Sequence, residues 1–291
     1  PRQAEPFESR YDKNGFRNDQ DLTSAEIAVI GDSYVESPMI PRSLLATTRL
    51  TEIQPKTVAN LGQSGYGPQQ ELAVLKRYAL PLHPKIVVWM FYEGNDLVDA
   101  EDYANKISHL NSSWNSMDGV WNRSLTKNSL LWLMRSIHDC VPKPSVEANH
   151  GTVLDDEGKE HRLYFLDHSS TVSLTAKELA GLQKSVAAIE EAYRVVQKEG
   201  AQFIVVFAPT TFRVYRDIAN FEKAGEDIKR WELNDLPDRF RKMISEISPD
   251  IGYLDLTSAL KSAARKNRLV FMSDDTHWSS EGHRVVAEAL A

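Results

Sequence analysis

The stretch Ile27-Ala28-Val29-Ile30-Gly31-Asp32-Ser33 decides the fold, because a short apolar run ends there in a glycine, an aspartate and a serine. Four consecutive apolar residues followed by a glycine are typical of a buried strand. Ser33 is then expected just past the carboxyl end of that strand, where open α/β sheets bind their ligands. Taken alone, residues 30–33 favour a simpler interpretation, in which Asp32 and Ser33 only cap the helix that follows.

Apolar runs and amphipathic stretches alternate along the rest of the chain. Further strands are predicted at residues 57–59, 86–91, 203–207 and 253–254, and helices at residues 68–80, 179–196, 231–247 and 281–290. Strands that alternate with helices indicate a parallel sheet with helices on both faces. The sequence therefore predicts one three-layer α/β/α domain over residues 1–291, with about five parallel strands in the general order of flavodoxin.

Two segments depart from this alternation. Residues 1–24 are polar with scattered aromatic side chains, and we interpret them as an N-terminal arm packed on the domain. Residues 99–173 contain no clean strand–helix unit, although residues 128–139 could form a helix. This insertion is far longer than the usual connections and leaves the third strand beside the predicted ligand crevice. We therefore expect it to form part of the wall or lid of the site.

Composition limits the functional classes. The chain has 291 residues, of which 42% are apolar and 26% charged, as is usual for a globular protein. A formal net charge of -7 disfavours nucleic acid as the main partner. The single cysteine, Cys140, excludes an internal disulfide framework and a cysteine-rich metal site. No apolar run predicts a transmembrane helix in this chain. Because the sequence begins at Pro1, an exported domain or one released from an N-terminal anchor is conceivable, and the compartment stays open.

Two further polar loops follow predicted strands. Residues 60–67 (Asn-Leu-Gly-Gln-Ser-Gly-Tyr-Gly) hold three glycines, which allow a backbone to turn tightly and to approach a ligand. Residues 93–96 (Glu-Gly-Asn-Asp) hold Asn95, whose side-chain amide can donate to an oxyanion. A plain loop and an Asx turn are the simpler interpretations of the two motifs when each is taken in isolation.

Residues 273–278 (Ser-Asp-Asp-Thr-His-Trp) place a histidine behind two acids near the C-terminus. A catalytic histidine needs a carboxylate at Nδ1 to fix its tautomer while Nε2 faces the nucleophile. Residues three apart in a helical turn are neighbours, whereas residues two apart are not. The spacing therefore favours Asp274 over Asp275 as the partner of His277. The alternative is a pair of surface acids beside a half-buried histidine.

These motifs occur together, in one order, and the first three each follow a predicted strand. In this the chain resembles the SGNH hydrolases, the superfamily of GDSL-like esterases and lipases that is named after a Ser, a Gly, an Asn and a His in four sequence blocks. The resemblance covers roughly residues 27–96 and 270–290. Two features depart from the pattern. The first block has Tyr34 where GDSL has leucine, and the doubled acid blurs the assignment of the acid, because relatives with a permuted order use a D-x-H pair.

The resemblance implies a role for five residues. Ser33 matches the nucleophile, and Asp274 and His277 match the acid and the base. Gly65 and Asn95 match the residues that, with the N–H of Ser33, donate to the oxyanion. The implied activity is the cleavage of carboxylic esters through an acyl-enzyme, without a metal or organic cofactor.

The expected substrates are short acyl or O-acetyl esters of small molecules or carbohydrates. One alternative is a glycan O-acetyltransferase that uses the same Ser33 and His277. Another is a non-catalytic glycan-binding relative, which the complete set of site residues disfavours. The remaining polar and aromatic candidates are assigned structural or surface roles: His150, His161 and His168, whose spacing fits no metal site, Glu71, Glu93, Asp96 and His283, and Trp114, Trp121 and Trp132.

Overall fold

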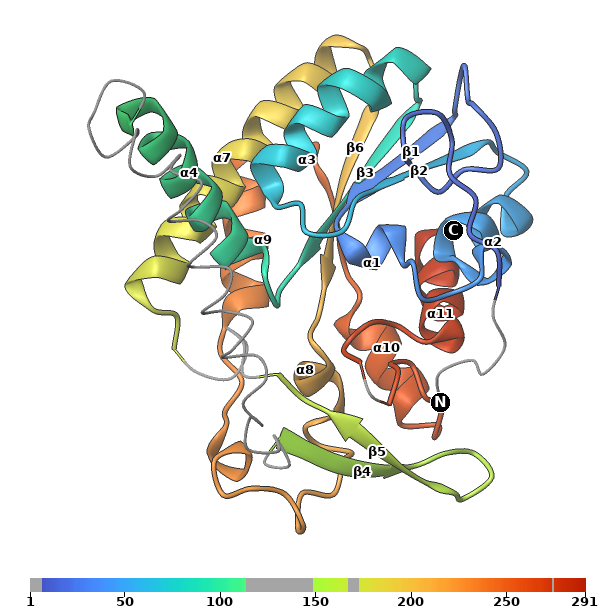
Figure 1. Cartoon of the computed structure of the whole chain (residues 1–291), viewed down its shortest axis with the longest axis vertical. Coiled ribbons are helices and arrows are strands. Elements are labelled where there is room, and N and C mark those ends of the chain that lie inside the picture. Colours follow the sequence, from blue (N-terminus) through green and yellow to red (C-terminus); the bar gives the residue numbers. More distant parts are fainter. Residues whose placement is uncertain (1–6, 114–148, 167–172, 274) are drawn as a thin grey trace, which may run out of the picture.

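A computed structural model of the protein describes residues 7–113, 149–166, 173–273 and 275–291 (Figure 1). A sheet of five parallel strands runs through its centre, in the order β2-β1-β3-β6-β7. The strands are β1 (Ile27–Gly31), β2 (Val58–Gly62), β3 (Ile86–Tyr92), β6 (Gln202–Ala208) and β7 (Gly252–Asp255). This is the flavodoxin-like order. The chain adds β2 on one side of β1 and all later strands of this sheet on the other side, so the order of the strands switches between β1 and β3 while the strands stay parallel. The predicted three-layer α/β fold with about five parallel strands is confirmed.

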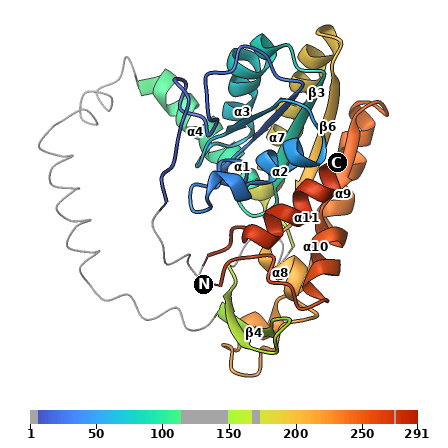
Figure 2. The same ribbon diagram turned by 90° about the vertical axis from the view of Figure 1, so that its right-hand side faces the viewer.

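Helices cover both faces of the sheet because successive strand residues point to opposite sides. Val87 and Trp89 of β3 face one core, and Val88 and Met90 face the other. The first core is covered by α3 (Pro68–Val74), the start of α4 (Asp96–Ser113), α7 (Ala176–Lys198) and α9 (Leu236–Ile247). The second is covered by α1 (Ser33–Glu36), α2 (Ala46–Ile53), α8 (Thr211–Tyr215), α10 (Thr257–Ala264) and α11 (Ser280–Leu290). Figure 2 shows α10 and α11 beside each other on the second face.

Short turns complete these layers. A π-helical turn at Leu75–Ala79 and a 3₁₀ turn at Leu80–Leu82 continue α3, so that the helix predicted at residues 68–80 forms in three pieces. Further 3₁₀ turns lie at Arg42–Leu44 and Ile228–Arg230. No helix among the described residues is long and apolar enough to cross a membrane.

The helix predicted at residues 231–247 is shorter than expected, because α9 begins at Leu236. Asn234 lies in the preceding loop, two residues before α9, and its side-chain oxygen accepts from the Leu236 N–H at 3.1 Å. Pro237 then occupies the first helical turn, the part of a helix that best tolerates the missing N–H of proline. The prediction was wrong over residues 231–235 because it used the apolar spacing and not these start signals.

The described part of the insertion contains an antiparallel hairpin of β4 (His150–Leu154) and β5 (Glu160–Tyr164). Figure 1 shows it near α8, beyond the carboxyl end of the sheet. Leu163 and the adjacent Phe165 are fully buried in the second core, and Thr152 pairs with Asn220. The predicted helix at 128–139 lies outside the described residues, as do Cys140, His168 and the three tryptophans of the insertion.

The described residues of the predicted N-terminal arm, 7–24, form turns and irregular backbone. Arg17 is buried, and its Nη1 atom donates to the carbonyl oxygens of Glu36 at 3.2 Å and of Ile40 at 2.9 Å, and also to that of Ser37. The arm therefore fixes residues 36–40, which form one wall of the pocket described next.

Candidate active site

Ser33 begins α1 immediately after β1, as the first sequence motif predicts. Asp32 is the N-cap of this short helix, and its carboxylate accepts from the Tyr34 N–H at 2.9 Å. The capping role and the exposure of Ser33 are thus compatible, since Asp32 is buried while Ser33 is half-buried. The Oγ atom of Ser33 lies 2.8 Å from Nε2 of His277, although 244 residues separate them in sequence.

The second ring nitrogen of His277 faces a carboxylate. Its Nδ1 atom lies 2.5 Å from Oδ1 of Asp275, and the same oxygen accepts from the His277 backbone N–H at 3.0 Å. Asp274 lies outside the described residues, so its predicted role stays a prediction. The spacing argument assumed a helical turn, but residues 275–278 form bends followed by a bridge between Trp278 and Phe271. In this turn, the residue two positions before the histidine reaches its ring.

The surroundings of His277 set its proton affinity. Burial disfavours the imidazolium, but the hydrogen bond and charge of Asp275, together with the charge of Asp32, outweigh it and raise the pKa of His277 above its ordinary value. In turn, the hydrogen bond to His277 chiefly lowers the pKa of Asp275. This arrangement keeps Asp275 ionised and makes His277 a stronger base towards Ser33.

Tyr34 holds the histidine loop from the sheet side. Its hydroxyl donates to the carbonyl oxygen of Thr276 at 2.5 Å, and its ring centroid lies 4.9 Å from that of His277. The ring also packs on Tyr92, at 4.0 Å, and against the edge of Trp278, at 4.9 Å. Sequence reasoning treated Tyr34 only as a departure from the GDSL pattern. A leucine cannot make this hydrogen bond, so the departure itself was the available signal.

The two other predicted oxyanion donors differ in their positions. Gly65 has a φ of 77°, a backbone conformation that favours glycine, and it lines the same pocket as Ser33 and His277. Asn95 follows β3, as expected, but it is not among the described residues that line that pocket. Its Nδ2 atom donates to Asp99 Oδ2 at 2.8 Å. Asp99 takes one of the two hydrogens of the Asn95 amide, so the second could donate to an oxyanion.

A small pocket of about 260 Å³ opens beside Ser33 and His277. Apart from Gly65 and three serines, the residues that line it are His277 and four apolar ones: Pro38, Met39, Ile40 and Met272. An apolar pocket beside a nucleophile excludes water and suits the hydrocarbon part of an acyl group. Sequence reasoning missed these four residues, because isolated apolar residues in loops carry no recognisable pattern.

Buried carboxyl groups lie behind the site. Glu71 and Asp96 are almost fully buried, and burial, followed by neighbouring carboxylates, raises the pKa of each well above its ordinary value. Asp96 accepts from the Tyr92 N–H at 2.7 Å, which closes the turn after β3. Glu93 accepts from Arg213 Nε at 2.6 Å and from the Thr210 N–H at 3.0 Å, and so joins the ends of β3 and β6.

Three histidines outside the site have other partners. Nδ1 of His283 accepts from the Ala46 N–H at 3.2 Å, and burial lowers the pKa of His283 to about 3. His161 pairs with Asp155 at 2.6 Å, and the ring of His150 packs against Tyr164. In the described ranges, no group of three or more His, Cys, Asp or Glu side chains is arranged to hold a metal ion.

Comparison with known proteins gives matches of two kinds. Residues 157–291 match the family model of the SGNH hydrolase-like domain of the acetyltransferase AlgX. The chain is 27% identical over 145 residues to the probable alginate O-acetylase AlgJ of Pseudomonas putida, a match that covers 50% of this chain and 34% of that relative. The chain thus spans about a third of the length of this curated relative.

Among solved structures, the chain is similar to a protein assigned to the G-D-S-L lipolytic family of Desulfitobacterium hafniense. The identity is 14%, the TM-score is 0.47, and the match covers 91% of this chain and 96% of the other. It is also similar to an acetylxylan esterase of Geobacillus stearothermophilus, with 11% identity, a TM-score of 0.46, and coverage of 93% of this chain and 94% of the other.

Proposed function

We propose that this chain, a member of the SGNH hydrolase superfamily, cleaves carboxylic esters through an acyl-enzyme formed on Ser33. One observation carries the proposal. The contacts Ser33 Oγ–His277 Nε2, at 2.8 Å, and His277 Nδ1–Asp275 Oδ1, at 2.5 Å, form a continuous chain from nucleophile to base to carboxylate. Nucleophilic serines are activated by this arrangement of groups.

The reaction follows from these contacts. His277 Nε2 takes the proton of Ser33 as Oγ attacks the ester carbonyl carbon, and Asp275 stabilises the imidazolium that forms. The negative charge on the carbonyl oxygen is held by the backbone N–H groups of Ser33 and Gly65. His277 then protonates the leaving alkoxide, which leaves the acyl group on Ser33. An acceptor hydroxyl, activated by His277, finally removes the acyl group and frees Ser33 again.

Asn95 is the third donor in this proposal. Its Nδ2 atom has two hydrogens, so one can stay on Asp99 while the other donates to the oxyanion, and this contribution grows as negative charge develops on the substrate. Asn95→Ala is therefore expected to lower kcat by roughly 10²-fold with little change in KM. Steady-state kinetics on an activated acetyl ester measure both constants. A normal kcat would show that Asn95 only closes the turn before α4.

The acceptor decides between a hydrolase and a transferase. Water as acceptor gives an esterase, whereas a carbohydrate hydroxyl gives a glycan O-acetyltransferase. The second candidate is favoured by the match of residues 157–291 to the acetyltransferase model and by the O-acetylase relative. The test loads the enzyme from p-nitrophenyl acetate, with and without polysaccharide, and follows the acetyl group. A transferase moves it to the polymer, and an esterase releases acetate in both cases.

The nucleophile is tested by covalent labelling. A fluorophosphonate probe is expected to label the protein once, at Ser33, and Ser33→Ala is expected to lose both the label and ester turnover. Ser258→Ala changes an exposed serine of α10 and serves as the matched control, with label and turnover retained. Undiminished turnover by Ser33→Ala would refute the proposed mechanism.

A further inference from the structure

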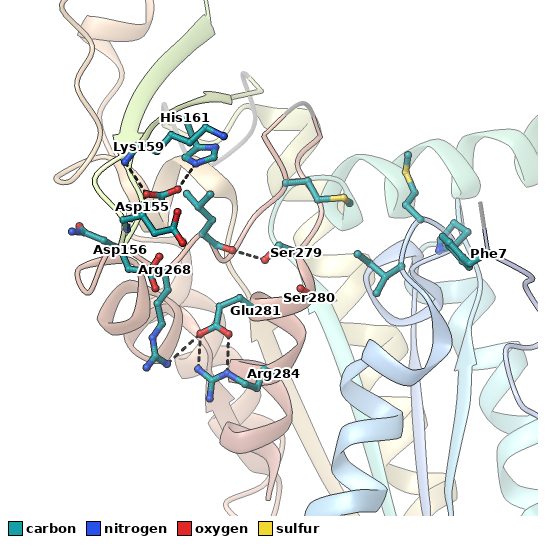
Figure 3. A pocket seen from close by; sticks show the side chains of 17 residues that line it. Phe7, Asp155, Asp156, Lys159, His161, Arg268, Ser279, Ser280, Glu281 and Arg284 are labelled. Carbon is teal, nitrogen blue, oxygen red and sulfur yellow. Dashed lines mark hydrogen bonds and ion pairs between the residues drawn. The ribbon is translucent and has the colours of Figure 1, made fainter. Parts of the chain in front are cut away.

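A second, larger hollow of about 1160 Å³ adjoins the Ser33 pocket, and we call it the long groove. The two hollows share four lining residues, Pro38, Met39, Ile40 and Met272, so they meet along one wall. Figure 3 shows the turn of the β4–β5 hairpin and the start of α11 along one side, with Phe7 opposite them. A molecule in the long groove can therefore reach the mouth of the Ser33 pocket.

Charged side chains line the long groove, but many of them neutralise one another. His161 contacts Asp155 at 2.6 Å. Glu281 contacts Arg268 at 3.2 Å and Arg284 at 2.6 Å, as Figure 3 shows. The complete charged lining, apart from His161, consists of three cations and four carboxylates: Lys159, Arg268, Arg284, Asp155, Asp156, Glu157 and Glu281. The described lining thus has no excess of positive charge.

The remaining lining combines polar and apolar groups. The side chains of Asn267 and Ser280 provide an amide and a hydroxyl, while Phe7, Met39 and Leu269 provide apolar surface. Paired carboxylates and guanidinium groups can still accept from and donate to neutral hydroxyls at their free atoms. Sugar rings offer hydroxyls at their edges and C–H groups on their faces, so they fit such a mixed surface.

We propose that the long groove binds an uncharged polysaccharide, whose hydroxyl or acetyl ester it presents to Ser33. This inference rests on the proposed function and extends it to the class of carbohydrate. The volume of the groove, about 1160 Å³, favours a polymer over a single sugar. The charge balance disfavours a polyuronate, because its carboxylates would lie beside four protein carboxylates, within the Debye length of about 10 Å. The net charge of -7 on the whole chain also disfavours the binding of a polyanion, because like charges repel.

The test measures binding to the full chain by calorimetry, with Ser33→Ala so that no turnover interferes. The probes are neutral β-1,4-linked glucose oligomers and β-1,4-linked uronic acid oligomers of equal length. Affinity for the neutral oligomers is expected to rise with length and to exceed affinity for the uronic acid oligomers by about 10-fold, that is, by about 1.4 kcal/mol. Added salt is expected to strengthen only the binding of the uronic acid oligomers, because it screens repulsion.

Charge reversal within the groove provides the second arm. Asp156→Lys/Glu157→Lys changes two exposed residues of the hairpin turn and is expected to raise affinity for the uronic acid oligomers at least several-fold. The matched control is Glu199→Lys/Asp250→Lys, which makes the same charge change in two exposed residues. They lie just before β6 and β7, at the amino ends of the strands, whereas Ser33 lies at the carboxyl end. The control is expected to leave both affinities and p-nitrophenyl acetate turnover unchanged.

The outcomes separate the groove from the catalytic proposal. Tighter binding of the uronic acid oligomers to the parent chain, equal effects of the two double variants, or binding of neither polymer would overturn the assignment of the groove. None of these results bears on the label at Ser33. Conversely, failure of the probe to label Ser33 would refute the mechanism while leaving a measured preference for neutral polymers intact.

Discussion

Two residues hold His277 from different sides, and each contact can be removed separately. Asp275 contacts Nδ1, and Tyr34 contacts the carbonyl oxygen of Thr276. The first contact sets the charge and tautomer of the imidazole, while the second sets the position of its backbone. Their loss should therefore have different kinetic signatures.

Asp275→Asn is expected to lower kcat by roughly 10³–10⁴-fold. The asparagine neither holds the imidazole of His277 in the required tautomer nor supplies the negative charge that stabilises the imidazolium. Asp275 raises the pKa of His277, so its removal lowers that pKa. Activity requires the neutral imidazole, and the acid limb of the pH profile of kcat/KM should thus move to lower pH. The matched variant is Asp274→Asn. If that variant carries the larger loss and the pH shift, the neighbouring acid is the partner, as the helical spacing predicted.

Tyr34→Phe keeps the ring contacts with Tyr92 and His277 but removes the hydroxyl that holds the Thr276 carbonyl. We expect kcat to fall about 5-fold with KM unchanged, since one net hydrogen bond contributes about 1 kcal/mol. Tyr34→Leu, the residue of the GDSL pattern, should lose the ring packing as well and fall further. Equal activities of Tyr34→Phe and the parent would show that packing alone positions the loop.

At the scale of elements, the buried ion pair of Glu93 and Arg213 connects the end of β3 with α8. Arg213→Met removes the guanidinium that pairs with the buried Glu93 carboxylate, which is expected to lower the free energy of unfolding by about 3–5 kcal/mol. Lys76→Met, which breaks an exposed pair with Glu191, is the control and should cost no more than about 1 kcal/mol. Urea unfolding curves compare them. Similar losses in both variants would show that the buried pair contributes no more to the free energy of unfolding than the exposed pair does.

The elements that sequence predicts well are those whose pattern is long or uniformly apolar. The strands at β1, β3 and β6 are apolar runs, and α7 has a long apolar stripe. The β4–β5 hairpin escaped prediction because neither strand is a continuous apolar run, and the buried apolar side chains are Val153 in β4 and Leu163 in β5. Its position depends on contacts with residues far along the chain, which a local pattern does not contain.

At the scale of the whole molecule, parallel topology explains why the site could be predicted in outline. Carboxyl ends of parallel strands meet at one edge, so the motifs after β1 and β2 had to converge there. The partner of His277 could not be decided in this way, because it depends on the conformation of one turn. The apolar wall from Pro38 to Ile40 likewise depends on Arg17, whose contacts with that loop no sequence spacing predicts.

Ser33 and His277 lie 244 positions apart in sequence, and this separation has a consequence for the synthesis of the protein. The ribosome therefore makes the base long after the nucleophile, and Trp278 beside the base packs against His283 of α11. A nascent chain that already contains the whole of β1 and Ser33 therefore has an inert hydroxyl. Reactivity should appear abruptly, when α11 seats against α2 and α10. The extent of covalent labelling at Ser33 would then measure the fraction of folded molecules. Labelling should be lost together with the global fold during denaturation.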